Sequence, residues 1–151
     1  MSEWLKEVEP LTQKGQISVP YSWWAGETAG RFLESLRDER KILGTRCSGC
    51  GKVYVPARKS CSRCFVDITE WVEIGDEGVI EAFTVVRYAH PVQPVQAPFA
   101  YALIRLDGAD VGFLHLIKKD LEKIGVGRRV KAVFKAERTG HILDIDSFEL
   151  L

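Results

Sequence analysis

The chain has 151 residues, of which 46% are hydrophobic and 28% charged, the composition of a folded globular protein with one domain or two small ones. Lysine and arginine together number 21, as do aspartate and glutamate, so no overall positive field favours nucleic acid or an anionic membrane. The N-terminus lacks the apolar core of a signal peptide, and no later stretch approaches the roughly 18 apolar residues of a membrane span. We expect a cytoplasmic protein that does not enter membranes and recognises its partners locally.

Residues 1–40 are predicted to form an arm followed by one or two short helices. Residues 1–20 mix charges, a glycine and two prolines without a clear period, which is typical of a poorly ordered or partner-dependent arm. From Trp23 to Arg40, apolar residues gather on one face opposite charged ones, and Ser22 is placed to cap the N-terminus.

All four tryptophans, Trp4, Trp23, Trp24 and Trp71, lie in the front half of the chain, where a small ribbon core has no room for all of them. Trp23 and Trp24 come immediately before the predicted helix, and Phe32 lies within it. Aromatic anchors dominate many protein interfaces, but packing of the helix against a barrel would bury the same side chains. Both interpretations stay open, and all three residues are candidate contacts to a partner or an acyl-CoA ligand.

Four cysteines form two close pairs, Cys47 with Cys50 and Cys61 with Cys64, separated by ten residues. In a reducing cytoplasm this spacing predicts metal ligands rather than disulfides, because each pair can form a tight turn that presents two thiolates. Residues 41–74 should form a small ribbon with short strands, too small to fold without its metal. We predict one structural Zn²⁺ with no open coordination position; an electron-transferring iron centre is the alternative, ahead of disulfides or free thiols.

The residues that follow the two cysteine pairs differ. Gly51 follows Cys50 and suits the positive φ that such a turn commonly needs, whereas Phe65 follows Cys64. The second turn is therefore predicted to be slightly irregular.

Residues 75–151 are predicted to form an OB-fold, a five-stranded barrel. Period-two patterns and turn signals predict five strands, with a short helix over residues 118–127 between the third and the fourth. The expected strands are Val79–Tyr88, Phe99–Asp107, Val111–Ile117, Val130–Glu137 and Ile142–Glu149. A helix after the third strand is the OB order. The predicted fold class is mainly β, with an N-terminal helical segment, a zinc ribbon and the barrel.

Two segments of the predicted barrel are candidate ligand sites. The loop of residues 89–98 lies beside the usual OB ligand face, and its lack of charge suits an acyl chain, a pantetheine arm or a protein surface; a rigid prolyl connector is the structural alternative. Residues 118–135 are rich in lysine and arginine, which attract phosphate, although such side chains usually face water. The candidates are Tyr88, Pro91, Pro94, Pro98, Phe99, Lys118, Lys119, Arg128 and Arg129.

The three histidines, His90, His115 and His141, are dispersed along the chain, and no nucleophile motif accompanies them. Surface or hydrogen-bonded histidines are the simpler interpretation. We therefore predict a protein that is not an enzyme.

The run from Ile42 to Gly51, the segment Tyr54–Arg58 and the strand Tyr101–Asp107 resemble an archaeal and bacterial family, formerly a domain of unknown function. The resemblance extends from about Tyr21 to Glu149 and implies a rubredoxin-like zinc ribbon joined to an OB-fold. It further implies a non-catalytic subunit associated with acyl-CoA chemistry, which accompanies a thiolase, a hydroxymethylglutaryl-CoA synthase or a hydratase. In archaea such subunits resemble scaffolds between thiolase and synthase. Lipid or isoprenoid precursor synthesis is the implied setting.

The second cysteine pair departs from the pattern of that family. The segment from Cys61 to Phe65 lacks the proline and glycine that are frequent there. The four metal ligands transfer directly, whereas contacts to acyl-CoA rest on the properties of the loop and the basic segment alone.

A zinc ribbon with an OB-fold is also a common nucleic-acid-binding architecture, so a single-stranded nucleic-acid binder is the second hypothesis. Residues 1–78 carry 11 basic and 12 acidic side chains, and residues 79–151 carry 10 and 9. Neither half has the basic footprint of a polyanion binder, which makes nucleic acid the less favoured partner.

Overall fold

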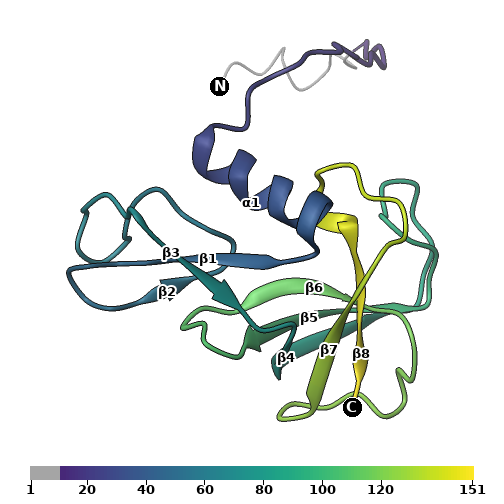
Figure 1. The fold of residues 1–151 in the computed structure, drawn as a ribbon. Helices are drawn as coiled ribbons and strands as arrows, with labels where there is room; N and C mark the ends of the chain where they lie inside the picture. The colour runs from purple at the N-terminus through teal and green to yellow at the C-terminus, as the bar shows by residue number, and fades with distance from the viewer. Residues whose placement is uncertain (1–10) are drawn as a thin grey trace, which may run out of the picture.

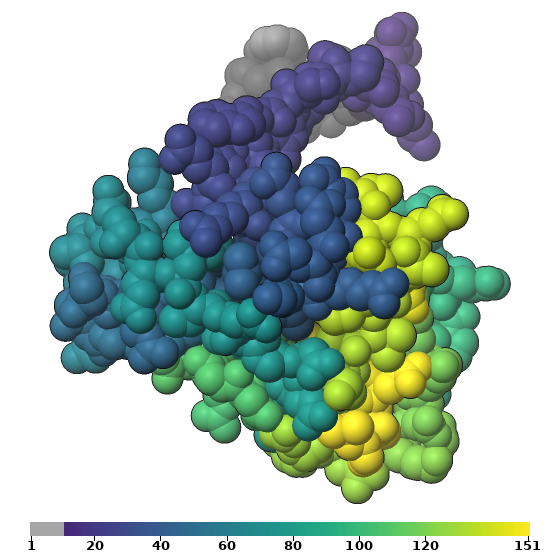
Figure 2. Space-filling view, in the orientation of Figure 1, coloured from purple at the N-terminus to yellow at the C-terminus, as the bar shows by residue number. Residues whose placement is uncertain are grey.

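The computed structural model describes residues 11–151, so half of the arm predicted for residues 1–20 lies outside the described part. One helix lies over a three-stranded ribbon and a closed five-stranded barrel, which adjoin each other (Figure 1). Residues 11–26 contain neither helix nor strand and project from this body, as Figure 2 shows.

Helix α1 (Glu27–Glu39) forms over an amphipathic stretch that buries Phe32, Ser35 and Leu36 on one face. The expected cap at Ser22 is wrong, because the helix begins four residues later, after Gly26, which makes no side-chain cap. The positive φ of Gly26, 84°, suits glycine and turns the chain into the helix. Within residues 11–151 no helix combines the length and the hydropathy of a membrane span.

The ribbon is an antiparallel sheet in the order β2-β1-β3. Its strands are β1 (Ile42–Arg46), β2 (Val53–Tyr54) and β3 (Glu70–Ile74). Strand β3 was not anticipated from the sequence. Its residues show weak alternation, and it forms because its whole length pairs with β1, from Ile42 opposite Ile74 to Arg46 opposite Glu70.

The barrel closes in the order β4-β5-β6-β8-β7, which is the OB topology expected. Its strands are β4 (Glu77–Val86), β5 (Phe99–Leu106), β6 (Phe113–Ile117), β7 (Arg129–Phe134) and β8 (Ile145–Leu150). Strand β4 pairs with both β5 and β7, and this closes the sheet on itself. At Gly78 an added Cβ would lie 2.5 Å from the Arg105 carbonyl oxygen, so only glycine fits where β4 approaches β5 this closely.

The helix predicted for residues 118–127 is absent, and turns take its place. Asp120 adopts φ 52° and Gly127 φ 84°, left-handed conformations that an α-helix cannot contain. A single Lys123 N–H to Asp120 carbonyl bond of 2.9 Å closes the first turn. The pattern of apolar and basic residues in this segment is therefore that of a turn folded onto the barrel.

The last strand also begins later than predicted. Residues Ile142–Asp144 form a short 3-10 helix, η2, and β8 starts at Ile145. The buried Asp144 carboxylate accepts N–H bonds from Thr139, Gly140 and His141 at 3.0, 2.7 and 3.1 Å. These bonds curl the chain into a turn and leave no extended backbone before Ile145.

One hydrophobic core joins the three parts. Its buried members include Phe32 and Leu36 from α1, Ile42, Val53 and Ile74 from the ribbon, and most of the inward-facing barrel residues. A smaller cluster around Cys47 and Cys61 completes the ribbon. Ribbon and barrel therefore share their interior instead of being joined by a flexible linker.

Candidate metal centre and binding surfaces

The four predicted ligands come together in the ribbon. The sulfurs of Cys47, Cys50, Cys61 and Cys64 all lie within 4.8 Å of one another, and Cys50 Sγ is 3.7 Å from Cys61 Sγ. A tetrahedral zinc with Zn–S bonds of about 2.3 Å separates its sulfurs by about 3.8 Å. The cluster therefore has the dimensions of a four-thiolate zinc site.

Both cysteine turns have the same backbone geometry. In the first, Gly51 N–H donates to the Cys47 carbonyl at 2.8 Å; in the second, Phe65 N–H donates to the Cys61 carbonyl at 3.0 Å. Gly51 has φ 74° and Phe65 has φ 56°. The irregularity expected in the second turn is absent from the backbone, because Phe65 adopts the conformation that glycine adopts in the first.

Three donors stabilise negative charge on Cys61. Its sulfur lies 3.2 Å from the Tyr54 hydroxyl and accepts the N–H groups of Arg63 and Cys64, each at 3.4 Å. The Tyr54 bond, with the Cys64 amide, lowers the pKa of Cys61 to about 6. The role of Tyr54 was missed at the sequence level, because tyrosine between two cysteine pairs is equally typical of a ribbon core.

A cation is required for all four sulfurs to be thiolates together. The hydrogen bond with neighbouring Cys50, followed by burial, raises the pKa of Cys64 to about 12. A bound divalent ion would lower this pKa by stabilising the thiolate of Cys64, and an all-sulfur tetrahedral set suits Zn²⁺. Four cysteine ligands fill the coordination shell, so the site holds one structural zinc and offers no position for substrate.

The candidate aromatic contacts before and within α1 have different surroundings. Trp23 and Trp24 are 75% and 79% exposed, whereas Phe32 is 2% exposed and belongs to the core. Phe32 is therefore a packing residue, and only the two tryptophans are accessible to a partner.

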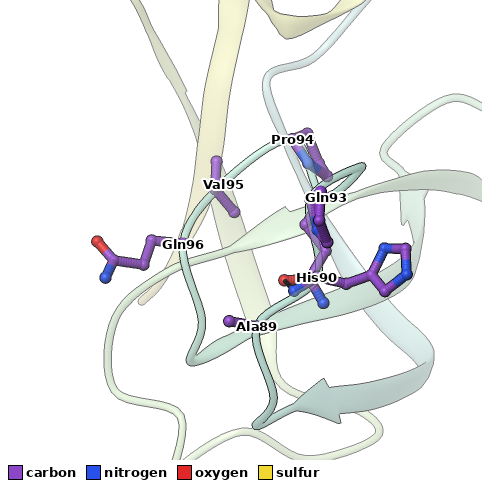
Figure 3. Close-up of a pocket in the computed structure, with 7 residues that line it drawn as sticks. Ala89, His90, Gln93, Pro94, Val95 and Gln96 are labelled. Carbon is purple, nitrogen blue, oxygen red and sulfur yellow. Dashed lines mark hydrogen bonds between the residues drawn. The ribbon is translucent and has the colours of Figure 1, made fainter.

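The loop between β4 and β5 encloses a shallow hollow of about 470 Å³ (Figure 3). Gln93 N–H donates to the His90 carbonyl at 3.1 Å, and Gln93 Nε2 donates to the Tyr88 carbonyl at 2.9 Å, so the loop is held by its own hydrogen bonds. The hollow is lined by Ala89, His90, Pro91, Gln93, Pro94, Val95 and Gln96. The side chains of His90 and Gln96 lie on opposite sides of the loop.

The other loop candidates lie at its two ends. Tyr88 is 71% exposed and Pro98 is also exposed, but Phe99 is fully buried. Tyr88, Pro91, Pro94 and Pro98 thus remain accessible, and Phe99 does not.

The candidate cations after β6 are mostly engaged with acidic side chains. Lys118 pairs with Asp146 at 2.6 Å and Lys119 with Glu149 at 2.7 Å. Arg129 bridges Asp107 and Glu77 at 2.7 and 2.9 Å, and these two hydrogen bonds raise its pKa. Of the four cations predicted to contact a ligand, Arg128 alone has no acidic partner within 4.0 Å among the described residues. Charge pairing thus favours a solvated surface over a phosphate site.

The histidines each have a structural environment. His115 is buried and lies near the rings of Phe113 and Phe148, at centroid distances of 5.4 and 5.6 Å. His141 caps η2 by accepting the Leu143 N–H at 3.1 Å, and His90 stabilises the loop turn. None of these contacts forms a nucleophile–base pair.

A closed four-thiolate ribbon that shares its core with an OB barrel defines a zinc-ribbon OB-fold protein. Residues 35–70 match the model of the ChsH2 rubredoxin-like zinc ribbon domain, and residues 71–135 match the ChsH2 C-terminal OB-fold domain. A crystal structure of a DUF35-family protein of unknown function from Sulfolobus solfataricus is 32% identical, with a TM-score of 0.60 over 72% of this chain and 77% of that one. The chain belongs to the DUF35 family.

Two archaeal relatives are each named as a DUF35 domain-containing scaffold protein. The one from Methanocaldococcus jannaschii is 28% identical over 70% of this chain and 75% of its own. The one from Methanothermobacter thermautotrophicus is 24% identical over 64% and 74%. A solved structure described as "Ltp2-ChsH2(DUF35) aldolase" has the same fold, with a TM-score of 0.58 at 19% identity over 85% of this chain and 95% of that one.

Proposed function

We propose that this chain is a non-catalytic scaffold subunit that partners a thiolase or a related CoA-condensing enzyme in the cytoplasm. The observation that carries the proposal is the combination of a closed metal site with a core shared by ribbon and barrel. A zinc ion with a complete thiolate shell stabilises the fold and performs no chemistry, and the shared core gives a rigid body suited to holding another protein. The names of the two archaeal relatives support a scaffold role.

The aldolase structure supports an enzyme as the partner. Its description names a DUF35 segment together with Ltp2, and its fold is that of the present chain. In this proposal the partner supplies the catalytic groups, and the present subunit supports an acyl-CoA intermediate of lipid or isoprenoid precursor synthesis. The uncharged loop with its hollow of about 470 Å³ is the proposed acyl or pantetheine contact, through Tyr88, Pro91, Pro94 and Pro98.

The test is affinity purification of the tagged chain from its native cytoplasm at moderate salt, with mass spectrometry of the bound proteins. We expect a thiolase or another CoA-condensing enzyme at a fixed stoichiometry, unchanged by nuclease treatment. Recovery of nucleic-acid-processing proteins that disappear on nuclease treatment would instead support the single-stranded nucleic-acid binder and overturn the scaffold proposal.

A further inference from the structure

The segment before α1 has the sequence pattern of a β-strand. From residue 17 to residue 23, large apolar residues alternate with small or polar ones without exception. The apolar set is Ile17, Val19, Tyr21 and Trp23, and the intervening set is Ser18, Pro20 and Ser22. In an extended chain, successive side chains point to opposite faces, so this period of two places all four apolar side chains on one face.

This strand pattern has no strand partner in the described chain. Residues 11–26 have no secondary structure, and residues 17–23 make no backbone hydrogen bond to another described residue. Ile17, Val19, Tyr21 and Trp23 are 91%, 67%, 79% and 75% exposed. Such an apolar face in water is unfavourable.

Pro20 restricts how this segment can pair. In an antiparallel ladder, alternate residues direct their N–H and C=O groups toward opposite neighbours. The backbone N–H and C=O groups of Ser18, Pro20 and Ser22 point to one edge of the strand, and Pro20 has no N–H to donate there. The backbone groups of the four apolar residues point to the other edge. One edge is therefore complete and the other is defective, which is the property of a strand that pairs on one side only.

The two aromatic side chains of the segment supply a substantial contact area. Tyr21 and Trp23 bury about 150–250 Å² each when fully covered, or about 300–500 Å² together, and Ile17 and Val19 add to this area. A standard protein interface takes about 800 Å² from each partner. The segment therefore provides much of one side of such an interface by itself, with backbone hydrogen bonds in addition.

We propose that residues 17–23 add as an edge strand to an exposed β-sheet edge of the partner enzyme, with the four apolar side chains in an apolar groove beside that edge. This inference rests on the proposed scaffold function, which supplies the enzyme as the occupant. Pairing through main-chain hydrogen bonds gives affinity, and the alternate side-chain pockets give specificity.

The chain's own sheet edges are the competing acceptors, in a second copy. In the ribbon, β2 has two residues, and β3 is five residues long and carries Glu70 and Glu73, which are in ion pairs with β1 and Lys41. In the barrel, residues 81–86 of β4 extend beyond its pairing with β7. A homodimer through that stretch is the alternative that the experiment must distinguish.

The experiment places single prolines along the segment. It measures the affinity of each variant for the CoA-condensing enzyme that affinity purification of the tagged chain recovers. Val19→Pro removes an N–H from the complete edge, and Ser22→Pro removes one from the defective edge. Val19→Ala controls for the lost side chain. We expect Val19→Pro to weaken binding at least about 10-fold more than Val19→Ala, because a ladder bond is lost, and Ser22→Pro to change it by less than about 3-fold.

Each outcome separates the two proposals. If the wild-type chain and the enzyme form no complex, the scaffold proposal fails and this inference falls with it. If the complex forms but Val19→Pro binds like Val19→Ala, or Ser22→Pro is equally damaging, the edge-strand inference alone is overturned. Light scattering that shows a dimer of the isolated chain, abolished by Val19→Pro, would make a second copy the occupant and would also overturn it.

Discussion

At the scale of single residues, Phe65 is the least expected side chain of the metal centre. It occupies the position that Gly51 takes in the first turn, at φ 56°, although a left-handed conformation costs a non-glycine residue about 1–2 kcal/mol. Its ring is 87% exposed and recovers none of that cost by packing. The zinc turn imposes its backbone geometry on whichever residue follows the second cysteine.

We expect Phe65→Gly to leave the free energy of unfolding unchanged or to raise it by up to about 1 kcal/mol, because relief of strain exceeds the greater freedom of glycine in the unfolded chain. Gly51→Ala should lower it by about 1 kcal/mol, because alanine is strained at φ 74°. Denaturant unfolding of the zinc-loaded variants measures both. A loss above about 1 kcal/mol in Phe65→Gly would mean that the ring packs on the metal centre.

At the scale of elements, β6 and β8 enclose a titratable group in the barrel. His115 on β6 lies near Phe148 on β8, its Nε2 lies 3.3 Å from the Ile142 carbonyl, and its Nδ1 has no partner among the described residues. Burial lowers the pKa of His115 below its ordinary value of 6.5. The folded barrel therefore favours the neutral imidazole.

The lowered pKa of His115 makes the folded protein less stable in acid. Below pH 6.5 the unfolded chain binds a proton that folded His115 resists, so the free energy of unfolding falls as the solution becomes more acidic. We expect a loss of at most about 1.4 kcal/mol per pH unit from this one proton. The measurement is denaturant unfolding of wild type and His115→Leu from pH 7.5 to 5.5 in excess zinc, which holds the thiolates metal-bound. Equal slopes in the two proteins would contradict the prediction.

At the scale of the whole molecule, the ribbon and the barrel share one hydrophobic core. Ile42, Val53, Val55 and Ile74 are ribbon residues buried in the same core as the barrel interior. Each contributes about 1.5–3 kcal/mol when fully buried. Loss of the ribbon would therefore expose one side of the barrel core.

We expect removal of zinc by a strong chelator to unfold β1–β3 and to lower the melting temperature of the barrel by about 10 °C or more, because a structural zinc site contributes about 10 kcal/mol to its own domain. Hydrogen exchange measured separately for the ribbon and barrel peptides distinguishes the two effects. Added Zn²⁺ should restore both, and Mg²⁺ should restore neither. Unchanged barrel protection in the zinc-free protein would show that the two modules are independent.

Local chemistry explains which features the sequence predicted. The four metal ligands were predicted, because two cysteine pairs at this spacing form the same turns wherever the chain places them. The five barrel strands were predicted because alternation persists over enough residues to outweigh local ambiguity. The regular backbone of the second cysteine turn was not predicted. A phenylalanine at Phe65 argues against a positive φ, and only the hydrogen bonds of the folded turn show that it adopts one.

By itself, the sequence determined the zinc ligands, the order of helix, ribbon and barrel, and the alternating pattern of residues 17–23. Only the tertiary structure decided that the segment after β6 forms turns, that β3 completes the ribbon, and that Phe32 and Phe99 are buried while Trp23 and Trp24 are exposed. It also paired Lys118, Lys119 and Arg129 with acids distant in sequence. The physical reason is the same in each case. Burial and ion pairing depend on which segments meet in space, and the local sequence pattern does not specify those contacts.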